Sequence, residues 1–166
     1  MEGEGVSPVS LSVLSMRVII DSREQDPLSF SLNEVVSEIT VGKLDFGDYS
    51  AIYQDKEEWK SPLFFTRKSI GDLYSTLANE ENHQRFKREM YRAKDSSAQL
   101  ILAIEGTDQD IFDGHKYSKL PGQTMMKILD TLWMKYDLYP MFCENRRVMA
   151  WRMVNLWSTF RRHWKK

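Results

Sequence analysis

The sequence predicts an α/β fold in which a mixed central sheet is flanked by helices. Strand-like segments come first along the chain and then alternate with helical ones, an order typical of a mixed sheet. Residues 99–105 contain five consecutive apolar residues and form the strongest buried-strand signal. The 166 residues suit one domain, and we expect a flexible tail over residues 1–15 and the domain over residues 16–166.

Four strands are expected before the first helix, each for its own reason. The run 16–21 is short and apolar, and residues 48–53 follow a glycine-bracketed turn. Residues 35–41 alternate in polarity, although a short helix over 33–37 is an alternative. Residues 62–66 are aromatic and apolar. Further on we expect strands at 99–105 and 138–142, a charged loop or hairpin tip at 55–60, an irregular connection at 106–120, and helices over 69–78, 82–94, 121–136 and 145–164.

Composition limits the class of protein and its setting. With 42% apolar and 28% charged residues, the chain reads as a globular protein. The net charge of -1 excludes a uniformly basic surface but allows a local basic patch. The single cysteine excludes a disulfide within the chain and suits a reducing compartment, so we expect an intracellular protein, cytoplasmic if bacterial or phage and nuclear if eukaryotic. No apolar run reaches membrane-spanning length, so no membrane association is expected.

Basic residues gather in two places. After residue 141 the only acid is Glu144, among seven lysines and arginines that include Arg146 and Arg147. They read either as a helix end that complements the helix dipole or as a surface that contacts phosphate. Lys116 and Lys119 lie in the polar connection before the helix at 121–136, which reads either as a DNA contact or as an exposed loop.

Acidic residues mark several strand ends. Asp21 ends the first strand, Glu24 follows it closely, and Asp48 begins the third. The fourth strand is closed by Thr66-Arg67-Lys68. Each signal alone is weak, because an aspartate at a strand end is most often a turn former. Converging together, they would supply the oxygen ligands for Mg2+ or Mn2+ and the lysine that phosphodiester hydrolysis needs.

The order of these segments resembles the nuclease motifs of the XPF family, in its compact bacterial and phage form. Those motifs are D-x-R-E, then G-D-Y, then E-R-K-x-x-x-D. The chain carries Ile20-Asp21-Ser22-Arg23-Glu24, then Gly47-Asp48-Tyr49, then Arg67-Lys68-Ser69-Ile70-Gly71-Asp72-Leu73. Arg85-Phe86-Lys87-Arg88-Glu89 followed by the apolar strand ending at Glu105 also fits the family pattern. The resemblance is clear over residues 16–105 and looser beyond.

The resemblance implies a restriction-endonuclease-like core and a site drawn from the motif residues, namely Asp21, Arg23, Glu24, Asp48, Thr66, Arg67, Lys68 and Asp72. It implies that Mg2+ or Mn2+ is held by Asp48, Asp21, Glu24 and the backbone carbonyl of Arg67. Lys68 would assist the attacking water or stabilise the transition-state charge. Asp72 would orient Arg67 or Lys68 by a charge-assisted hydrogen bond.

The chain departs from the family at position 66, where the motif glutamate is replaced by Thr66. A hydroxyl is a poorer ligand for a hard dication than a carboxylate, so metal binding and hydrolysis should weaken. Three explanations stay open. The protein is a pseudonuclease, or Thr66 is a deliberate inactivating change, or a nearby acid such as Glu24, Asp45 or Glu57 takes over.

Our leading hypothesis is a metal-dependent endonuclease for branched or flap DNA, as the resemblance implies, with a role in DNA repair or recombination. The alternative is a non-catalytic module on the same fold that binds DNA. A third reading is a dimerisation subunit, because the last helices are rich in Met and Trp, side chains that suit either a core or a homodimer interface.

Overall fold

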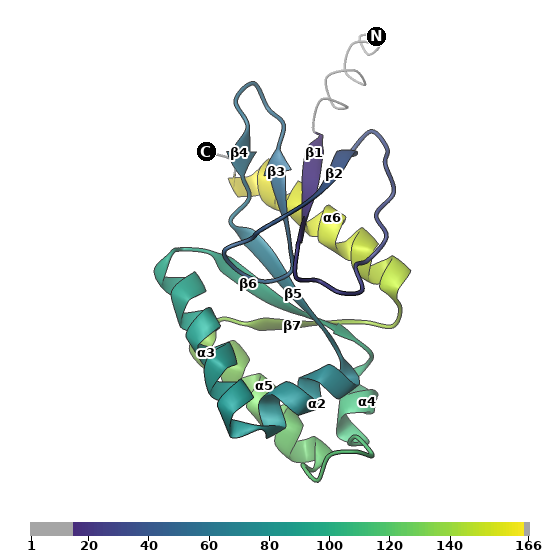
Figure 1. Cartoon of the computed structure of the whole chain (residues 1–166), viewed down its shortest axis with the longest axis vertical. Helices are drawn as coiled ribbons and strands as arrows, with labels where there is room; N and C mark the ends of the chain where they lie inside the picture. The colour runs from purple at the N-terminus through teal and green to yellow at the C-terminus, as the bar shows by residue number, and fades with distance from the viewer. Residues whose placement is uncertain (1–14, 165–166) are drawn as a thin grey trace.

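The computed structural model describes residues 15–164, so all of the predicted tail except Ser15 lies outside the described residues. One sheet forms the centre of the structure (Figure 1). Its strands are β1 (Met16–Asp21), β2 (Val36–Gly42), β3 (Tyr49–Tyr53), β4 (Trp59–Lys60), β5 (Leu63–Ser69), β6 (Gln99–Glu105) and β7 (Tyr139–Cys143). The helices are α2 (Ile70–Ala78), α3 (Glu80–Asp95), α4 (Asp108–Phe112), α5 (Gly122–Tyr136) and α6 (Arg146–Trp164).

The sheet is mixed, as predicted. The strand order is β2-β1-β3-β5-β6-β7, with β4 paired to β3. The pairs β1–β2, β5–β6 and β6–β7 are parallel, whereas β3 is antiparallel to β1, β4 and β5. Three parallel strands, β5 to β7, therefore continue from an antiparallel centre, and helices make the connections between them.

Strand β6 divides the core into two layers because its side chains alternate between the faces of the sheet. Ile101 and Ala103 pack with α6, whereas Leu100, Leu102 and Ile104 pack with α2, α3 and α5. Figure 1 shows this division, with α6 behind β1 to β4 and the other helices below them.

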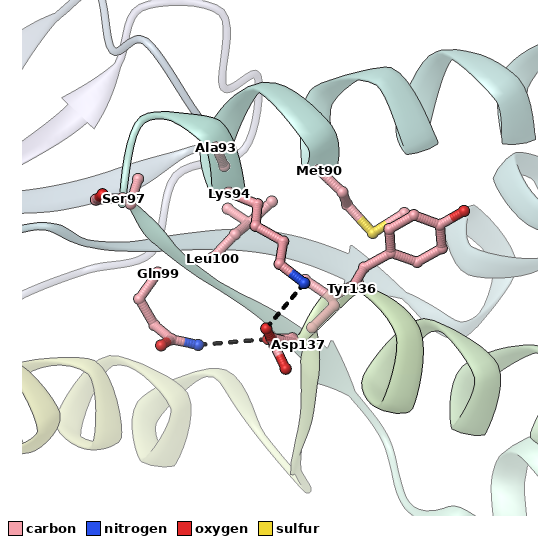
Figure 2. A pocket seen from close by; sticks show the side chains of 10 residues that line it. Met90, Ala93, Lys94, Ser97, Gln99, Leu100, Tyr136 and Asp137 are labelled. Carbon is pink, nitrogen blue, oxygen red and sulfur yellow. Dashed lines mark hydrogen bonds and ion pairs between the residues drawn. The ribbon is translucent and has the colours of Figure 1, made fainter.

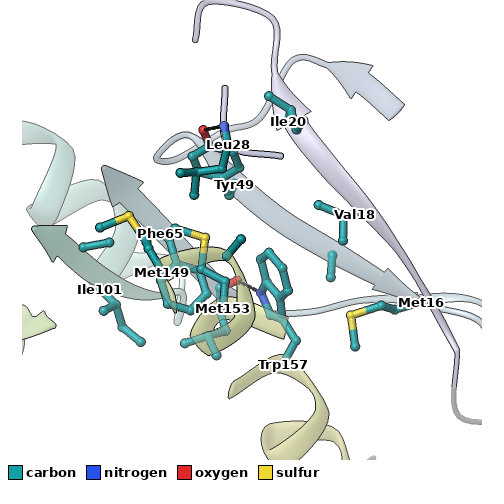
Figure 3. Packing of buried hydrophobic residues seen from close by; sticks show 14 of the residues in the cluster. Met16, Val18, Ile20, Leu28, Tyr49, Phe65, Ile101, Met149, Met153 and Trp157 are labelled. Carbon is teal, nitrogen blue, oxygen red and sulfur yellow. Dashed lines mark hydrogen bonds between the residues drawn. The ribbon is translucent and has the colours of Figure 1, made fainter. Parts of the chain in front are cut away.

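The core layer between α6 and the sheet is held by hydrogen bonds of Trp157 as well as by apolar packing. Trp157 is fully buried, and its Nε1 donates a hydrogen bond of 2.9 Å to the carbonyl of Leu63. Tyr53 donates its hydroxyl hydrogen to the Trp157 carbonyl at 2.8 Å. Phe65 meets the Trp157 ring edge to face, with Met149 and Met153 alongside (Figure 3). Met149, Met153 and Trp157 of α6 therefore belong to the core, whereas Trp151 and Trp164 of the same helix are exposed.

The structure corrects several sequence-based boundaries. Strand β5 continues to Ser69 instead of ending at Thr66, because it pairs with β6 along its whole length. Residues 108–112 form helix α4 within the connection expected to be irregular, started by a capping box between Thr107 and Asp110. The segment 55–60 contains β4. Residues 36–42 form β2, which decides against the short helix.

The basic residues near the C-terminus do not form one exposed surface. Arg161 is only 2% exposed, pairs with Asp55 and donates to the Ser15 carbonyl. It therefore contributes to the fold and cannot contact phosphate. No helix within residues 15–164 is both long and apolar enough to cross a membrane.

Candidate active site

The register of the sheet brings three motif segments to the same edge. Ile20 on β1 lies opposite Tyr49 on β3, which lies opposite Phe65 on β5. The next residues along are Asp21, Asp48 and Thr66. The amide of Asp21 donates to the Asp48 carbonyl at 2.8 Å, and the amide of Asp48 donates to the Phe65 carbonyl at 2.7 Å.

Gly47 makes this approach sterically feasible. Its φ is +65°, and a Cβ at this position would lie 2.7 Å from the Phe65 carbonyl oxygen. A side chain would therefore both strain the backbone and collide with β5. The Gly47 amide donates a hydrogen bond of 2.9 Å to Glu89 Oε2 on α3. The glycine of the G-D-Y motif thus seats Asp48 between β5 and α3.

Asp48 is half-buried and only partly satisfied. Its Oδ2 accepts a 2.7 Å hydrogen bond from the amide of Arg67 and lies 3.5 Å from Thr66 Oγ1. Burial raises the pKa of Asp48 to about 6, and the negative charges of Glu24 and Glu89 also raise it. The hydrogen bond from the Arg67 amide and the charge of Lys68 lower this pKa but do not outweigh the burial. The site therefore holds a carboxylate that would be stabilised by an added positive charge.

Glu24 and Arg67 form a buried, two-pronged ion pair. Arg67 donates from Nε and Nη2 to the two carboxylate oxygens of Glu24, at 2.9 and 3.0 Å, and the side chains are 10% and 9% exposed. Tyr49 donates its hydroxyl hydrogen to Glu24 as well. Burial alone would raise the pKa of Glu24, but the hydrogen bonds from Arg67 and Tyr49 outweigh it and the pKa is lowered. Glu24 is thus held as a structural anion.

The ion-pair network continues to the ends of β6 and α6. Arg67 Nη1 donates to Glu105 Oε2 at 2.7 Å, and the same oxygen accepts from Arg146 Nη1 at 2.9 Å. Arg146 also donates to the carbonyls of Asp26 and Pro27. Arg146, predicted to contact DNA, is therefore engaged in linking α6 to the loop after β1.

Asp21 is saturated by a different set of partners. Its carboxylate accepts hydrogen bonds from the amide, Nε and Nη2 of Arg23 and from the amide of Leu44. The bonds from Arg23 lower the pKa of Asp21 to about 2, despite burial. Because both carboxylate oxygens are engaged, Asp21 shapes the turn after β1, and its predicted role as a metal ligand would require these bonds to break.

Lys68 opens onto a basic groove of about 560 Å³ beside α3. Its Nζ lies 5.5 Å from the centre of the Phe86 ring. The groove is lined by five basic side chains and a single acid, Glu89. Three of the basic residues come from α3, and the full set is Arg23, Lys68, Arg85, Arg88 and Arg92. The field in this groove therefore favours an anion.

The family model of the ERCC4 domain matches residues 20–150, which is most of the chain. The chain belongs to the ERCC4 domain family. It is an XPF-type nuclease domain in fold, which confirms the resemblance and the predicted restriction-endonuclease-like sheet. Among curated proteins, none is significantly similar in sequence.

Two solved structures show the same fold as this ERCC4 domain. XPF from Aeropyrum pernix is 16% identical with a TM-score of 0.62, over 89% of this chain and 66% of that one. XPF from Aeropyrum pernix in complex with DNA is 16% identical with a TM-score of 0.59, over 87% of this chain and 64% of that one. The chain therefore spans just under two thirds of these proteins.

Two further motif residues of this ERCC4 domain, Thr66 and Asp72, add no charged group to the site. Thr66 is 5% exposed, so it occupies the motif-glutamate position as a buried neutral group. Asp72 is exposed in the first turn of α2, whose cap is Ser69, and among residues 15–164 it has no ion pair or side-chain hydrogen bond. The orienting role expected of Asp72 belongs to Glu24 and Glu105, which contact Arg67 directly.

The other predicted DNA contacts lie away from the basic groove. Lys116 and Lys119 are exposed in the connection before α5, with Lys116 over the Tyr117 ring. Arg147 is exposed at the start of α6 and borders an apolar hollow of about 510 Å³ with Trp151. Their role in DNA binding stays a prediction.

A separate pocket lies at the opposite end of β6, and an ion pair between two of its lining residues crosses it. It measures about 210 Å³, between the C-terminal ends of α3 and α5 (Figure 2). Lys94 and Asp137 form an ion pair of 3.3 Å across it, and Gln99 donates to the Asp137 carbonyl. Met90 and Tyr136 supply apolar walls. This pocket takes no part in the site around Asp48.

Two acids of the site escaped the sequence analysis as functional residues. Both lie in segments that fit the XPF family pattern, Glu89 in a helix and Glu105 at a strand end, but the sequence alone assigned no role to either. Their placement depends on how β6 and α3 pack against β5, which local sequence does not encode. Glu89 had one available signal, an acid among arginines on a helix next to the motifs.

Proposed function

We propose that this domain is a Mg2+- or Mn2+-dependent DNA endonuclease whose chemistry centres on Asp48 and Lys68. The observation that carries the proposal is their position, since the half-buried Asp48 carboxylate at the sheet edge feels the charge of Lys68, which lines the basic groove. Such a combination serves hydrolysis of an anionic ester.

The basic groove supports DNA as the substrate. Five basic side chains spread along α3 and the site suit several successive phosphates rather than one small anion. One structural neighbour is described in complex with DNA. Preference for branched or flap DNA, and a place in repair or recombination, follow from the family resemblance and are part of the proposal.

The donor set fits a hard dication with few protein ligands. No group of three or more His, Cys, Asp or Glu side chains suited to a metal occurs in residues 15–164. Mg2+ commonly needs only one or two carboxylates, with water and substrate phosphate completing its shell. Asp48 fits this role because, unlike Asp21 and Glu24, it has no ion-pair partner among the described residues. When bound, the metal would polarise the phosphate and acidify water.

The residues of the chain have separable tasks in this proposal. Lys68 offsets charge that develops on the phosphoryl oxygens as water forms a new P–O bond and the ester P–O bond breaks, giving a phosphomonoester and a hydroxyl. Arg67, locked by Glu24 and Glu105, holds the Asp48 carboxylate through its backbone amide. The Arg67 carbonyl remains a candidate metal ligand.

A second candidate is a DNA-binding module without activity, favoured by Thr66. A buried hydroxyl 3.5 Å from Asp48 replaces a carboxylate and lowers the negative charge available to a dication. Thr66→Glu discriminates the two. If the wild type binds DNA but cuts nothing and Thr66→Glu cuts, the natural chain is a pseudonuclease.

The direct test is cleavage of labelled flap and fork DNA with Mg2+ or Mn2+. We expect metal-dependent products that disappear with EDTA and fall at least about a hundredfold in Asp48→Asn. Asp130→Asn, the same change at an exposed position of α5, is the matched control and should cut normally. Cleavage that survives equally in Asp48→Asn would contradict the proposal.

Homodimerisation is a further part of the proposal and has one structural support. Trp151 and Val148 on α6 are 64% and 37% exposed beside the apolar hollow, as an interface would require. Mass measurement in solution tests it, and Trp151→Glu should shift any dimer to the monomer.

A further inference from the structure

We propose that Glu89 of α3 supplies the second carboxylate of the site, in place of the acid missing at position 66. This inference rests on the proposed nuclease function and names a ligand residue outside the motifs. It gives the site Asp48 and Glu89 as its two anionic oxygen donors, with Thr66 as a neutral neighbour.

Geometry places Glu89 next to Asp48. Glu89 Oε2 accepts the Gly47 amide at 2.9 Å, and Gly47 directly precedes Asp48 in a turn that cannot carry a side chain at that position. The charge of Glu89 acts on both Asp48 and Arg23. A residue 41 positions further along the chain is therefore anchored beside Asp48, the proposed metal ligand, by a specific hydrogen bond.

Glu89 also approaches from the face of the sheet onto which position 66 projects. Phe64 packs in the layer of α2, α3 and α5, whereas Phe65 packs in the layer of α6. Side chains alternate along a strand, so Thr66 and Lys68 share the face of Phe64. A carboxylate on α3 therefore comes from the same side as a glutamate at position 66 would.

The carboxylate of Glu89 is available to bind a metal ion, whereas the carboxylates of Glu24 and Glu105 at this edge are held by arginine. Among residues 15–164 it forms no ion pair within 4 Å, although it is the one acid lining a groove with five basic residues. Only Oε2 has a described hydrogen bond. By contrast, Glu24 and Glu105 are each held by arginine. Although the groove as a whole favours an anion, the carboxylate of Glu89 has no ion-pair partner of its own among the described residues, so it can bind a cation together with Asp48.

The other replacements considered for Thr66 are poorly placed. Both carboxylate oxygens of Glu24 are bonded to Arg67. Glu57 is exposed in the hairpin between β3 and β4. Asp45 is exposed, and the contact described for it is its backbone carbonyl with Arg92. Of these acids and Glu89, only Glu89 has a carboxylate contact with the turn that holds Asp48.

The test measures Mn2+ binding to the protein without DNA, from the electron paramagnetic resonance signal of free Mn2+. Glu89→Gln keeps an oxygen that can accept the Gly47 amide but removes the charge, so folding is retained. We expect Mn2+ affinity to fall about tenfold or more, and Thr66→Glu in the Glu89→Gln background to return it to within about threefold of wild type. Glu81→Gln, an exposed residue of α3 outside the groove, should leave affinity unchanged.

Two outcomes would overturn the inference, and cleavage assays separate them. If the wild type binds Mn2+ and cuts DNA but Glu89→Gln binds Mn2+ equally well, Glu89 is not a ligand and the nuclease function stands. If the wild type neither binds Mn2+ nor cuts DNA, the inference and the proposed function fail together.

Discussion

Arg67 and Lys68 are neighbours on β5, yet they lie in opposite electrostatic settings. Arg67 is buried between two glutamates, Glu24 and Glu105, and every group in that set has a partner. Lys68 lines the groove at α3 together with Glu89, and neither Glu89 nor the nearby Asp48 has an ion-pair partner among residues 15–164. The paired set holds the strands together, and the open set is left able to bind something else.

This difference teaches that motif membership does not identify a reactive residue. Asp21, Glu24 and Arg67 belong to the motifs but are engaged in ion pairs with one another or with neighbouring charged side chains. Glu89 lies outside the motifs that name the site and, among residues 15–164, has no ion-pair partner. Whether a charged side chain already has an ion-pair partner is visible only in the folded structure, and it separates the residues that support the site from the candidates for chemistry.

The largest effect that distinguishes the two sets is expected on stability. Arg67→Met leaves Glu24 and Glu105 without their shared partner, and we expect the free energy of unfolding to fall by about 3–5 kcal/mol. Lys68→Met breaks no ion pair among the described residues and should cost less than about 1 kcal/mol. Urea unfolding of both variants measures this. Equal losses would contradict the division.

A smaller effect concerns the pH dependence of stability without metal. The pKa of Asp21 is lowered from 3.8 to about 2, so its stabilisation is present above pH 4 and is lost as the pH falls toward 2. The pKa of Asp48 is raised from 3.8 to about 6, so the folded state binds the extra proton and stability falls as the pH rises from about 4 to 6.

Asparagine substitutions isolate these opposite slopes. At pH 8, Asp48→Asn should stabilise the fold by about 1–2 kcal/mol, because the buried charge is removed. Asp21→Asn should destabilise it at the same pH, because the Arg23 and Leu44 donors lose an anionic acceptor. Unfolding curves at pH 2, 4, 6 and 8 record both. For each variant, the difference in free energy of unfolding from the wild type is plotted against pH. If the contributions of Asp21 and Asp48 changed with pH in the same direction, the assigned pKa shifts would be wrong.

The smallest effect is expected on DNA affinity. Arg85→Ala and Arg88→Ala in the basic groove should each weaken binding about threefold and lower the salt dependence by about one counterion. Lys116→Ala and Lys119→Ala, outside the groove, should change DNA affinity less if DNA binds mainly along the groove. Fluorescence anisotropy at several salt concentrations compares them, and a stronger loss from the two lysines would relocate the DNA path.

The sequence predicted the sheet and the motif positions well because both depend on local patterns. Apolar runs identified β1, β5 and β6, and the Gly47-Asp48 step indicated the turn that the positive φ requires. Boundaries were less accurate, since the extension of β5 to Ser69 comes from pairing with β6.

The site was predicted only in part, because contacts between distant segments decide it. Asp72 was expected to orient Arg67 or Lys68 from nearby in sequence, but the partners of Arg67 are Glu24 and Glu105, the latter 38 residues away. Arg161 read as a surface charge and is buried against Asp55. Glu89 reaches Gly47 across 42 residues. Local patterns cannot establish such pairings.

The anomalous scattering peak of a crystal soaked in Mn2+ would show whether Asp48 and Glu89 hold the metal together. Our account predicts one peak in contact with the carboxylates of Asp48 and Glu89, with Asp21 still bonded to Arg23 and Glu24 still bonded to Arg67. A peak bound to Asp21 or Glu24, or fully occupied Mn2+ elsewhere with none at Asp48, would contradict it.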